Sequence, residues 1–305
     1  MKRRVGISTH FLQSKFGDEQ ALKIAAQIGA DAVDFSTILS IHDYRKHDSI
    51  YAKSDDEIYS YYRGLKTLAD NLGLEICQTH GRISGFKNIK ADDDALVENM
   101  RRDCIACSAL EAKYCVVHST TTIHLGPDAP SELMHSLNFD MFNRFIPLAK
   151  KYGVMIASET FGDASKYNCC DFFGNIDEFE KSYKDVCAAS DNAKYMSICM
   201  DTGHSNKAMR FGNPTPADVI RRLGPDIKVL HLNDNDTLTD QHKIPLTGCI
   251  DWDSVFDALD EIGYDGVYNM ELNLSLIGGK NLEVETADYA VKVMRNMLKN
   301  RYGNL

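Results

Sequence analysis

Short apolar runs alternate with longer amphipathic stretches along the chain, and this pattern predicts eight strands that each precede a helix. Continuous apolar runs are typical of strands covered on both faces, and a 3.6-residue period is typical of the helices that cover them. The predicted strands are 5–9, 32–36, 75–80, 114–119, 154–160, 196–202, 227–234 and 266–272. The predicted helices are 18–29, 55–73, 92–112, 134–152, 176–189, 215–223, 252–263 and 281–300.

Eight strand–helix units in 305 residues predict an α/β fold, a (β/α)8 TIM barrel, formed as a single domain over residues 1–305. A doubly wound sheet fits less well because no G-x-G-x-x-G motif follows the first predicted strand. In a TIM barrel the active site lies at the carboxyl ends of the strands. The long segments 36–54 and 119–133 are expected to cover that end and to determine substrate choice.

Four polar residues lie at the carboxyl ends of the last four predicted strands: Glu159, Asp201, His231 and Glu271. Carboxylates that converge at one end of a barrel repel one another unless a cation lies between them. The sequence therefore predicts a divalent-metal site with open coordination positions. Three carboxylates and one imidazole suit Mn2+ or Mg2+ better than they suit a thiolate-rich zinc site.

Further polar residues fall at the same end of the predicted barrel. They are His80, His118, His204, Asp240 and His242. A single histidine in a strand is more often a hydrogen-bonded core residue than a ligand, but a shared position at strand ends favours a place in the site. We expect His80, His118, His204 and His242 to contact the substrate. Arg82 and Lys243 are either further substrate contacts or solvated loop charges.

The predicted ligands also suit acid–base chemistry at a carbon next to a carbonyl. A 2-hydroxy carbonyl fragment could chelate the ion, which would stabilise the enediolate formed when the neighbouring C–H loses its proton. Glu159 and Glu271 come from different strands, so one can remove a proton while the other delivers one to the opposite face, which inverts a stereocentre. A single carboxylate that carried the proton to the next carbon would instead give an aldose–ketose isomer. The sequence leaves both outcomes open.

Several motifs in the second half of the chain resemble a known superfamily. They are SET at 158–160, MDTGHSN at 200–206, HLNDND at 231–236 with DQH at 240–242, G-x-IDW at 248–252 and MEL at 270–272. The chain resembles the xylose isomerase-like TIM barrel superfamily, and within it the sugar phosphate isomerase/epimerase proteins that include D-tagatose and D-psicose 3-epimerases. The resemblance implies a Mn2+, Mg2+ or Co2+ ion held by Glu159, Asp201, His231 and Glu271. It also implies that His204 contacts a sugar or sugar phosphate.

The same superfamily contains endonuclease IV, whose three zinc ions use further histidines. The positions of His80, His118, Asp240 and His242 match those extra ligands. The motifs around Asp201 and after His231 depart from the nuclease patterns, so the resemblance favours a sugar isomerase or epimerase. Two alternatives stay open, a zinc phosphodiesterase acting on DNA and a lyase or dehydratase that acts on a keto-sugar or inosose with the same site.

Composition narrows the partners and the compartment. A net charge of −10 disfavours broad contact with nucleic acid or with anionic membranes, and no run approaches the roughly 18–20 apolar residues that span a bilayer. The first residues lack the apolar core of a signal peptide, and nine cysteines are an odd number that fits reduced thiols. We expect a cytoplasmic enzyme with a small-molecule partner, whose apolar helix faces are compatible with a homo-oligomer. Cys104 and Cys107 are expected to be structural, and Cys169 and Cys170 receive no role.

Overall fold

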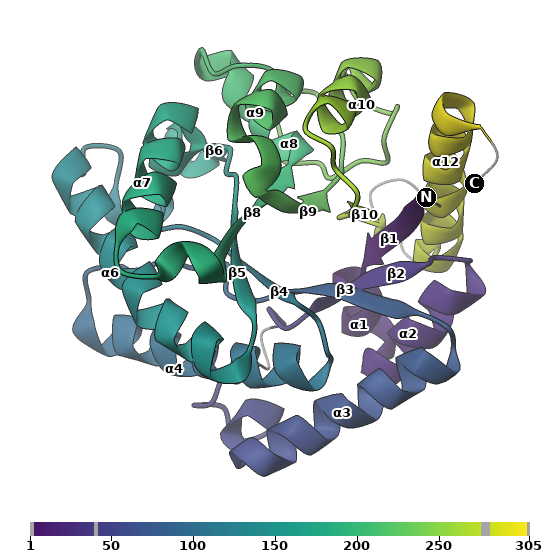
Figure 1. The fold of residues 1–305 in the computed structure, drawn as a ribbon, viewed down its shortest axis with the longest axis horizontal. Coiled ribbons are helices and arrows are strands. Elements are labelled where there is room, and N and C mark those ends of the chain that lie inside the picture. The colour runs from purple at the N-terminus through teal and green to yellow at the C-terminus, as the bar shows by residue number, and fades with distance from the viewer. Residues whose placement is uncertain (1–2, 40–41, 276–280, 304–305) are drawn as a thin grey trace.

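The computed structural model describes residues 3–39, 42–275 and 281–303. Eight parallel strands form one sheet in the order β10-β1-β2-β3-β4-β5-β8-β9, and helices surround it (Figure 1). The strands are β1 Arg4–Ser8, β2 Ala32–Ser36, β3 Glu75–His80, β4 Tyr114–Val117, β5 Met155–Glu159, β8 Met196–Asp201, β9 Ile227–His231 and β10 Val267–Met270. The fold is the predicted TIM barrel.

The two ends of the sheet, β9 and β10, meet through a short seam. Leu232 pairs with Met270 as an isolated parallel bridge. The Leu232 N–H donates to the carbonyl of Asn269 at 2.9 Å, and the Glu271 N–H donates to the carbonyl of Leu232 at 3.3 Å. Ladders of several residues join all the other neighbouring strands. The seam therefore closes the barrel through one bridged residue pair, whereas every other neighbouring pair of the eight-stranded sheet shares at least three residue pairs.

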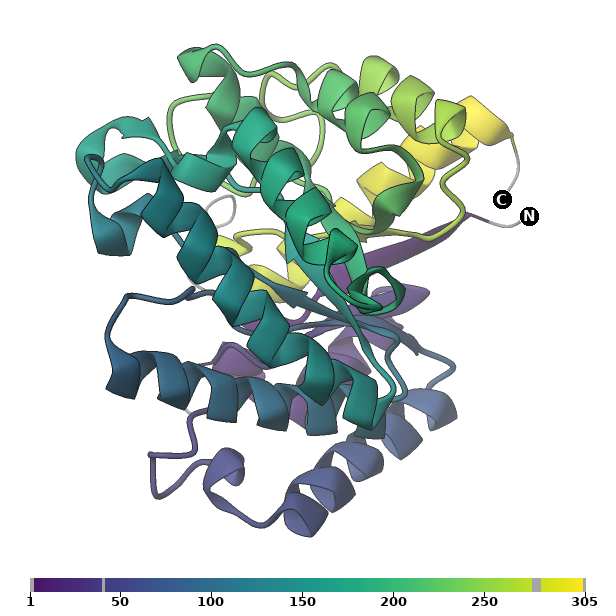
Figure 2. The same cartoon turned by 60° about the vertical axis from the view of Figure 1, so that its left-hand side comes forward.

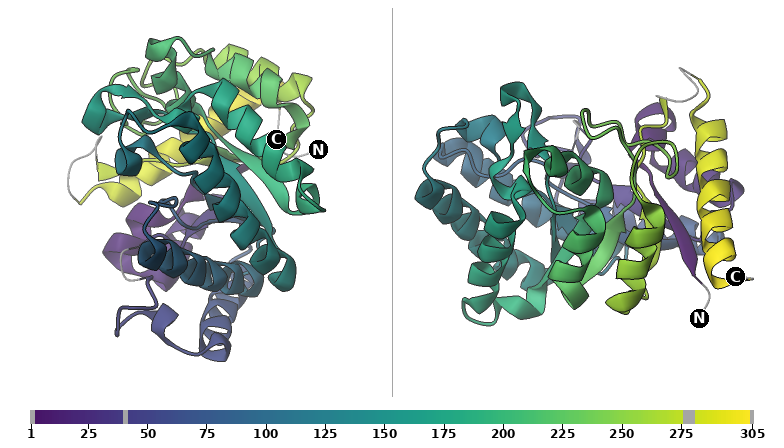
Figure 3. Two further views of the ribbon diagram at one scale, coloured as in Figure 1. Left: turned by 90° about the vertical axis from the view of Figure 1, so that its left-hand side faces the viewer. Right: turned by 90° about the horizontal axis from the view of Figure 1, so that it is seen from above.

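In the described chain a main helix follows each of the eight strands of the barrel, in the predicted order. The main helices are α2 Asp18–Gln27, α3 Asp55–Asn71, α4 Lys90–Ala109, α6 Ser131–Tyr152, α7 Ile176–Ala188, α9 Pro216–Leu223, α10 Trp252–Glu261 and α12 Glu283–Tyr302. Consecutive helices α3, α4 and α6 pack against one another around one side of the barrel (Figure 2). Helix α12 lies alongside β1 (Figure 3). None of the helices in the described ranges is both long and apolar enough to cross a membrane.

Local sequence signals explain where several helices begin and end. Ser54 and Glu57 form a reciprocal capping box at the start of α3, with the Glu57 side chain bonded to the Ser54 N–H. Thr215 caps α9, whose first residue is a proline. Helix α6 ends at Gly153, which has a φ of 71°, a left-handed conformation that glycine adopts without strain.

Three short α-helices and a small hairpin in the described chain were not predicted. They are α1 His10–Phe16, α5 Thr122–Leu125, α8 Thr202–Ala208 and the two-stranded hairpin of β6 Asp163–Ala164 with β7 Cys169–Cys170. The segment 119–133 contains α5 and is fastened to the β6–β7 region because Thr121 Oγ1 donates to Asp171 at 2.5 Å. The segment 36–54 is held at Thr37, which donates to the His80 carbonyl, and its residues 40 and 41 lie outside the described chain.

The core lies in two regions. Most apolar side chains fill the layer between strands and helices, including Val33 and Phe35 of β2. A small apolar cluster formed by Val116, Ala157, Cys199 and Val229 lies on the other face of the strands, inside the barrel. The interior also holds buried polar side chains at the carboxyl ends of the strands. This end of the barrel is where the active site of a TIM barrel lies.

Candidate metal centre and active site

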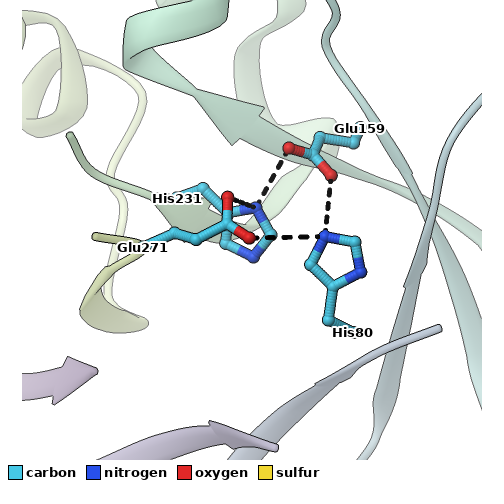
Figure 4. Close-up of side chains that lie close together, drawn as sticks. All are labelled: His80, Glu159, His231 and Glu271. Carbon is cyan, nitrogen blue, oxygen red and sulfur yellow. Dashed lines mark hydrogen bonds and ion pairs between the residues drawn. The ribbon is translucent and has the colours of Figure 1, made fainter. Parts of the chain in front are cut away.

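Four side chains from four strand ends converge on one point (Figure 4). The Nδ1 atom of His231 lies 3.1 Å from Glu159 Oε1 and 3.4 Å from Glu271 Oε2. The Nε2 atom of His80 lies 3.4 Å from Glu159 Oε2 and 3.6 Å from Glu271 Oε1. One ligand atom from each of the four residues lies within 4.8 Å of the others. Two carboxylates and two imidazoles at these separations form a donor set for a divalent cation.

Asp201 lies beside this group rather than inside it. Its Oδ1 accepts a hydrogen bond from the His204 N–H at 2.6 Å, which caps α8, and its Oδ2 accepts from Asn233 Nδ2 at 2.8 Å. Gly203 is required next to Asp201 because a Cβ there would lie 1.8 Å from Asn233 Oδ1. Asp201 forms potential ligand groups with Glu159 and His204 and with His242 and Glu271. The groups overlap, so Asp201 adjoins the same centre.

His118 and Phe161 border the centre on one side. His118 Nε2 forms an ion pair with Glu159 Oε2 at 2.9 Å. The Phe161 ring centroid lies 5.2 Å from that of His118 and 5.2 Å from that of His204. Phe161 is half-buried and was not predicted as a site residue. Its place directly after SET, at the end of β5, is the signal that could have identified it.

A second cluster adjoins the first. His242 Nε2 lies 3.3 Å and His204 Nε2 3.7 Å from Asp240 Oδ2, and the three residues form another potential ligand group. The Lys207 ammonium is buried, 2.5 Å from Asp163 Oδ1 and 3.6 Å from Asp240 Oδ1. Asp240 therefore already has a cationic side chain next to it.

The loop that carries this second cluster is organised by a buried carboxylate. Asp234 is fully buried and accepts hydrogen bonds from Trp252 Nε1 at 2.9 Å and from the Leu246 and Ile250 N–H groups at 3.1 Å. Gly248 passes so close that a Cβ on it would lie 2.2 Å from Asp234 Oδ1. The IDW motif thus fixes the loop through Asp234, and this loop sets the positions of Asp240 and His242.

The carboxylates and imidazoles shift one another's pKa values. Burial opposes the ionised form of Glu159, but the charges of His231 and His118 outweigh it and hold the pKa of Glu159 well below its usual value. Burial likewise opposes the charged form of His231, yet Cys199, Glu271 and Glu159 raise its pKa well above 6.5. Burial raises the pKa of Asp201. The imidazolium groups supply the positive charge that a metal ion would supply, so a bound ion would displace protons.

Several buried polar atoms at the centre point toward a ligand. Within the described residues, Glu159 Oε2, His80 Nδ1 and His118 Nε2 are buried without a hydrogen-bond partner, although Glu159 and His118 form an ion pair. Buried polar atoms are normally satisfied, and unsatisfied ones often mark an ion or water site. The carboxylate oxygen of Glu159 that faces the histidines is therefore suited to a bound cation.

Arg82 is not placed where a substrate contact was predicted. Its Nε donates to Asp103 Oδ2 at 2.6 Å, and its Nη2 donates to Asp103 Oδ1 at 2.9 Å and to the Thr37 carbonyl at 2.6 Å. Its Nη1 donates to the His42 carbonyl at 3.0 Å. Asp103 is fully buried on α4 and needs this counter-ion. Arg82 thus fastens the segment 36–54 to α4 instead of facing the site.

The other sequence-predicted residues lie close to the centre. Lys243 follows His242 in the sequence, and its backbone pairs with that of Asp234. A contact between the Lys243 ammonium and a substrate stays a prediction. Asp34 on β2 contacts the centre as well, since its Oδ2 lies 2.8 Å from His231 Nε2.

Comparison with protein families gives one match that spans most of the chain. Residues 22–297 match the family model described as xylose isomerase-like TIM barrel, which confirms the resemblance seen in the sequence. An uncharacterized protein of Methanocaldococcus jannaschii is 29% identical over 176 residues, which cover 57% of this chain and 56% of the relative. An inosose isomerase of Bacillus velezensis is 24% identical over 264 residues, 83% of this chain and 82% of the relative. The alignments with the first two curated relatives cover 56% and 52% of those proteins, just over half of each.

Solved structures share the fold. A D-tagatose 3-epimerase-like protein superposes with a TM-score of 0.73 at 21% identity, over 97% of each chain. The IOLI protein with a bound zinc atom superposes with a TM-score of 0.71 at 17% identity, over 99% of this chain and 100% of the other. At these identities the superpositions establish the barrel fold.

Proposed function

The chain belongs to the xylose isomerase-like TIM barrel family, and on this premise we propose that it is a divalent-metal-dependent sugar isomerase or epimerase. The observation that carries the proposal is the convergence of Glu159 and Glu271 on the same two imidazoles, those of His80 and His231. Two carboxylates from different strands that approach one buried point can serve a reaction in which a proton leaves and returns.

Glu159, His231 and Glu271 would hold the ion together with Asp201, the ligand predicted from the sequence, which adjoins this centre, and His80 converges on the same point as a further candidate ligand. The carboxylate-rich set favours Mn2+, Mg2+ or Co2+, and the zinc atom in the similar IOLI structure supports a divalent ion in this family of barrels. When bound, the ion would supply electrophilic stabilisation of the negative charge that develops as a carbon next to a carbonyl loses its proton.

The glutamates are suited to hold and move that proton. Glu159 ends β5 and is fully buried at the point where the four side chains converge, so its carboxylate would accept a proton from a bound sugar. Glu271, at the end of β10, would hold a proton for the other face of the substrate carbon. Return of the proton to the opposite face gives an epimer, and transfer to the next carbon gives an aldose–ketose isomer.

His204, His242 and Phe161 line the space beside the glutamates and would bind the sugar's hydroxyl groups and its apolar face. The inosose isomerase and the D-tagatose 3-epimerase-like protein among the similar proteins support a polyhydroxylated carbonyl compound as substrate. A lyase or dehydratase would begin with the same proton removal and then expel a leaving group.

The test measures that shared first step. Metal-free protein is reloaded with Mn2+ and incubated in D2O with a panel of ketoses, aldoses, their phosphates and inososes, and the products are followed by NMR. We expect deuterium at the carbon next to the carbonyl of one compound and the appearance of its epimer or isomer. Glu159→Gln should abolish both signals, whereas Glu98→Gln, which changes a carboxylate paired with Arg101 and Arg102 on α4, should retain them. If no compound exchanges with Mn2+, Mg2+, Co2+ or Zn2+ present, the proposal is wrong.

A second candidate rests on the cluster of His204, Asp240 and His242. Together with His80 and His118 it could hold additional zinc ions, as an endonuclease IV-like phosphodiesterase would require. Lys207 beside Asp240 and the net charge of −10 count against this candidate. Elemental analysis separates the two candidates, since one ion per chain supports the sugar enzyme and three zinc ions with cleavage of abasic DNA support the hydrolase.

A further inference from the structure

We propose that Asp34 is a positioning residue that holds His231 with its Nδ1 atom toward the metal centre. This inference rests on the proposed function, because it concerns a ligand of the proposed ion. Asp34 lies on β2, and His231 ends β9 on another part of the barrel wall. Both side chains are fully buried.

The two nitrogen atoms of His231 face different groups. Nε2 lies 2.8 Å from Asp34 Oδ2, and Nδ1 lies 3.1 Å from Glu159 Oε1 and 3.4 Å from Glu271 Oε2. The side of the ring that could bind an ion is therefore opposite the side that contacts Asp34. An imidazole that donates one N–H to a carboxylate keeps the lone pair of its other nitrogen for a metal, and it becomes a stronger donor.

A neighbouring amide does not fix the proton in the same way. The side-chain amide nitrogen of Gln78 lies 3.1 Å from His231 Nε2. An amide turned by half a rotation exchanges its oxygen and nitrogen, so Gln78 can pair with Nε2 in either protonation state. A carboxylate only accepts. Asp34 is thus the contact that requires a proton on Nε2 and leaves Nδ1 for the centre.

The environment of Asp34 is poorly explained by a role in the fold alone. Its second oxygen, Oδ1, is buried without a hydrogen-bond partner among the described residues. An incompletely satisfied buried carboxylate costs stability. Asp103 shows the contrast, since it is also fully buried but bonds to Arg82, Thr37 and Tyr51. Within the described residues, the Asp34 carboxylate has its hydrogen bond to His231, one of the proposed metal ligands.

The experiment measures the affinity of the metal-free protein for Co2+ and Mn2+ by isothermal titration calorimetry. Asp34→Asn keeps the shape of the side chain and removes its charge, and Asp34→Ala removes the acceptor. We expect both variants to bind the ion about 10- to 100-fold more weakly than the wild type. Asp103→Asn is the matched control, because it also removes the charge of a fully buried carboxylate. It should lower the temperature of unfolding but leave the metal affinity within about twofold of the wild-type value. An effect of carboxylate loss on the fold alone would weaken metal binding in both variants.

The outcomes separate the inference from the proposed function. If the wild type binds none of the ions, the proposed metal centre is wrong and the role of Asp34 falls with it. If the wild type binds an ion and folded Asp34→Asn binds it equally tightly, the inference is refuted while the proposed function stands. If Asp103→Asn weakens binding as much as Asp34→Asn, the effect is structural and the inference is also refuted.

Discussion

Raising the pH should destabilise the metal-free protein, and His242 gives the part of this effect that can be worked out in most detail. Its Nε2 lies 3.3 Å from Asp240 Oδ2 and its Nδ1 lies 3.6 Å from Glu271 Oε2. Burial opposes the charged imidazolium, but the bond to Asp240 and the charge of Glu271 outweigh burial and raise the pKa of His242 from 6.5 to about 9. At about 1.4 kcal/mol per pKa unit, this shift corresponds to about 3 kcal/mol of folding free energy.

The direction follows from proton binding. Between the unfolded and folded pKa values, the folded protein holds a proton on His242 that the unfolded chain has released. The stabilisation is therefore fully present below about pH 6.5 and is lost as the pH rises through about 9. Burial opposes the charge on His80 and His231 too, but their carboxylate neighbours raise both pKa values, so these residues add to the same trend.

Urea unfolding in the presence of a chelator measures the free energy of unfolding of the metal-free protein at several pH values from about 6 to about 9.5. The wild type should lose free energy of unfolding across this range, and His242→Asn should lose about 3 kcal/mol less because asparagine does not titrate. His47→Asn, a change at an exposed histidine, should retain the wild-type dependence. A wild-type stability that stays level or increases with pH would refute the reasoning, as would a wild-type slope in His242→Asn.

Two substitutions test the site and its support. Glu271→Gln should lower sugar turnover about 100- to 10,000-fold, as expected for loss of an acid–base group. NMR of the product mixture would measure the turnover, and turnover within threefold of wild type would exclude an acid–base role for Glu271. Trp252→Phe should lower the free energy of unfolding by about 1–3 kcal/mol because it removes a hydrogen bond to the buried Asp234 carboxylate. Urea unfolding would measure this loss, and an unchanged stability would show that water or a neighbouring donor replaces the indole N–H.

The positions of the strands and of the main helices along the chain could be predicted because they depend on local sequence patterns. Buried strands need apolar runs, and the helices between them show an amphipathic period. Helix α8 lacks that signal, since all seven of its residues, Thr202–Ala208, are buried and most of them are polar. Its start is determined by the bond from the His204 N–H to Asp201 and by the close approach of Asn233 to Gly203, and the latter depends on the neighbouring strand.

The site residues were predicted from their shared position at strand ends, which is a property of the barrel. What each one contacts could not be read in the same way. Arg82 lies two residues after His80, yet its partner Asp103 lies on the next long helix, α4. Asp34 lies in an apolar run on β2, and only the closed barrel brings it to His231 on β9. Such pairs form between residues far apart in the sequence, where the closed sheet brings them together. Burial then makes a partner necessary for each charged group.

The short seam between β9 and β10 links closure of the barrel to ion binding. His231 ends one strand of the seam and Glu271 follows the other, while hydrogen bonds at Leu232 close it. An ion that binds both side chains would link the two strands across the shortest strand pairing of the eight-stranded sheet, so ion binding would be coupled to complete closure of the barrel. Amide hydrogen exchange at Leu232 and Glu271 should then slow on loading with Mn2+, whereas unchanged exchange would mean that the seam stays closed without the ion.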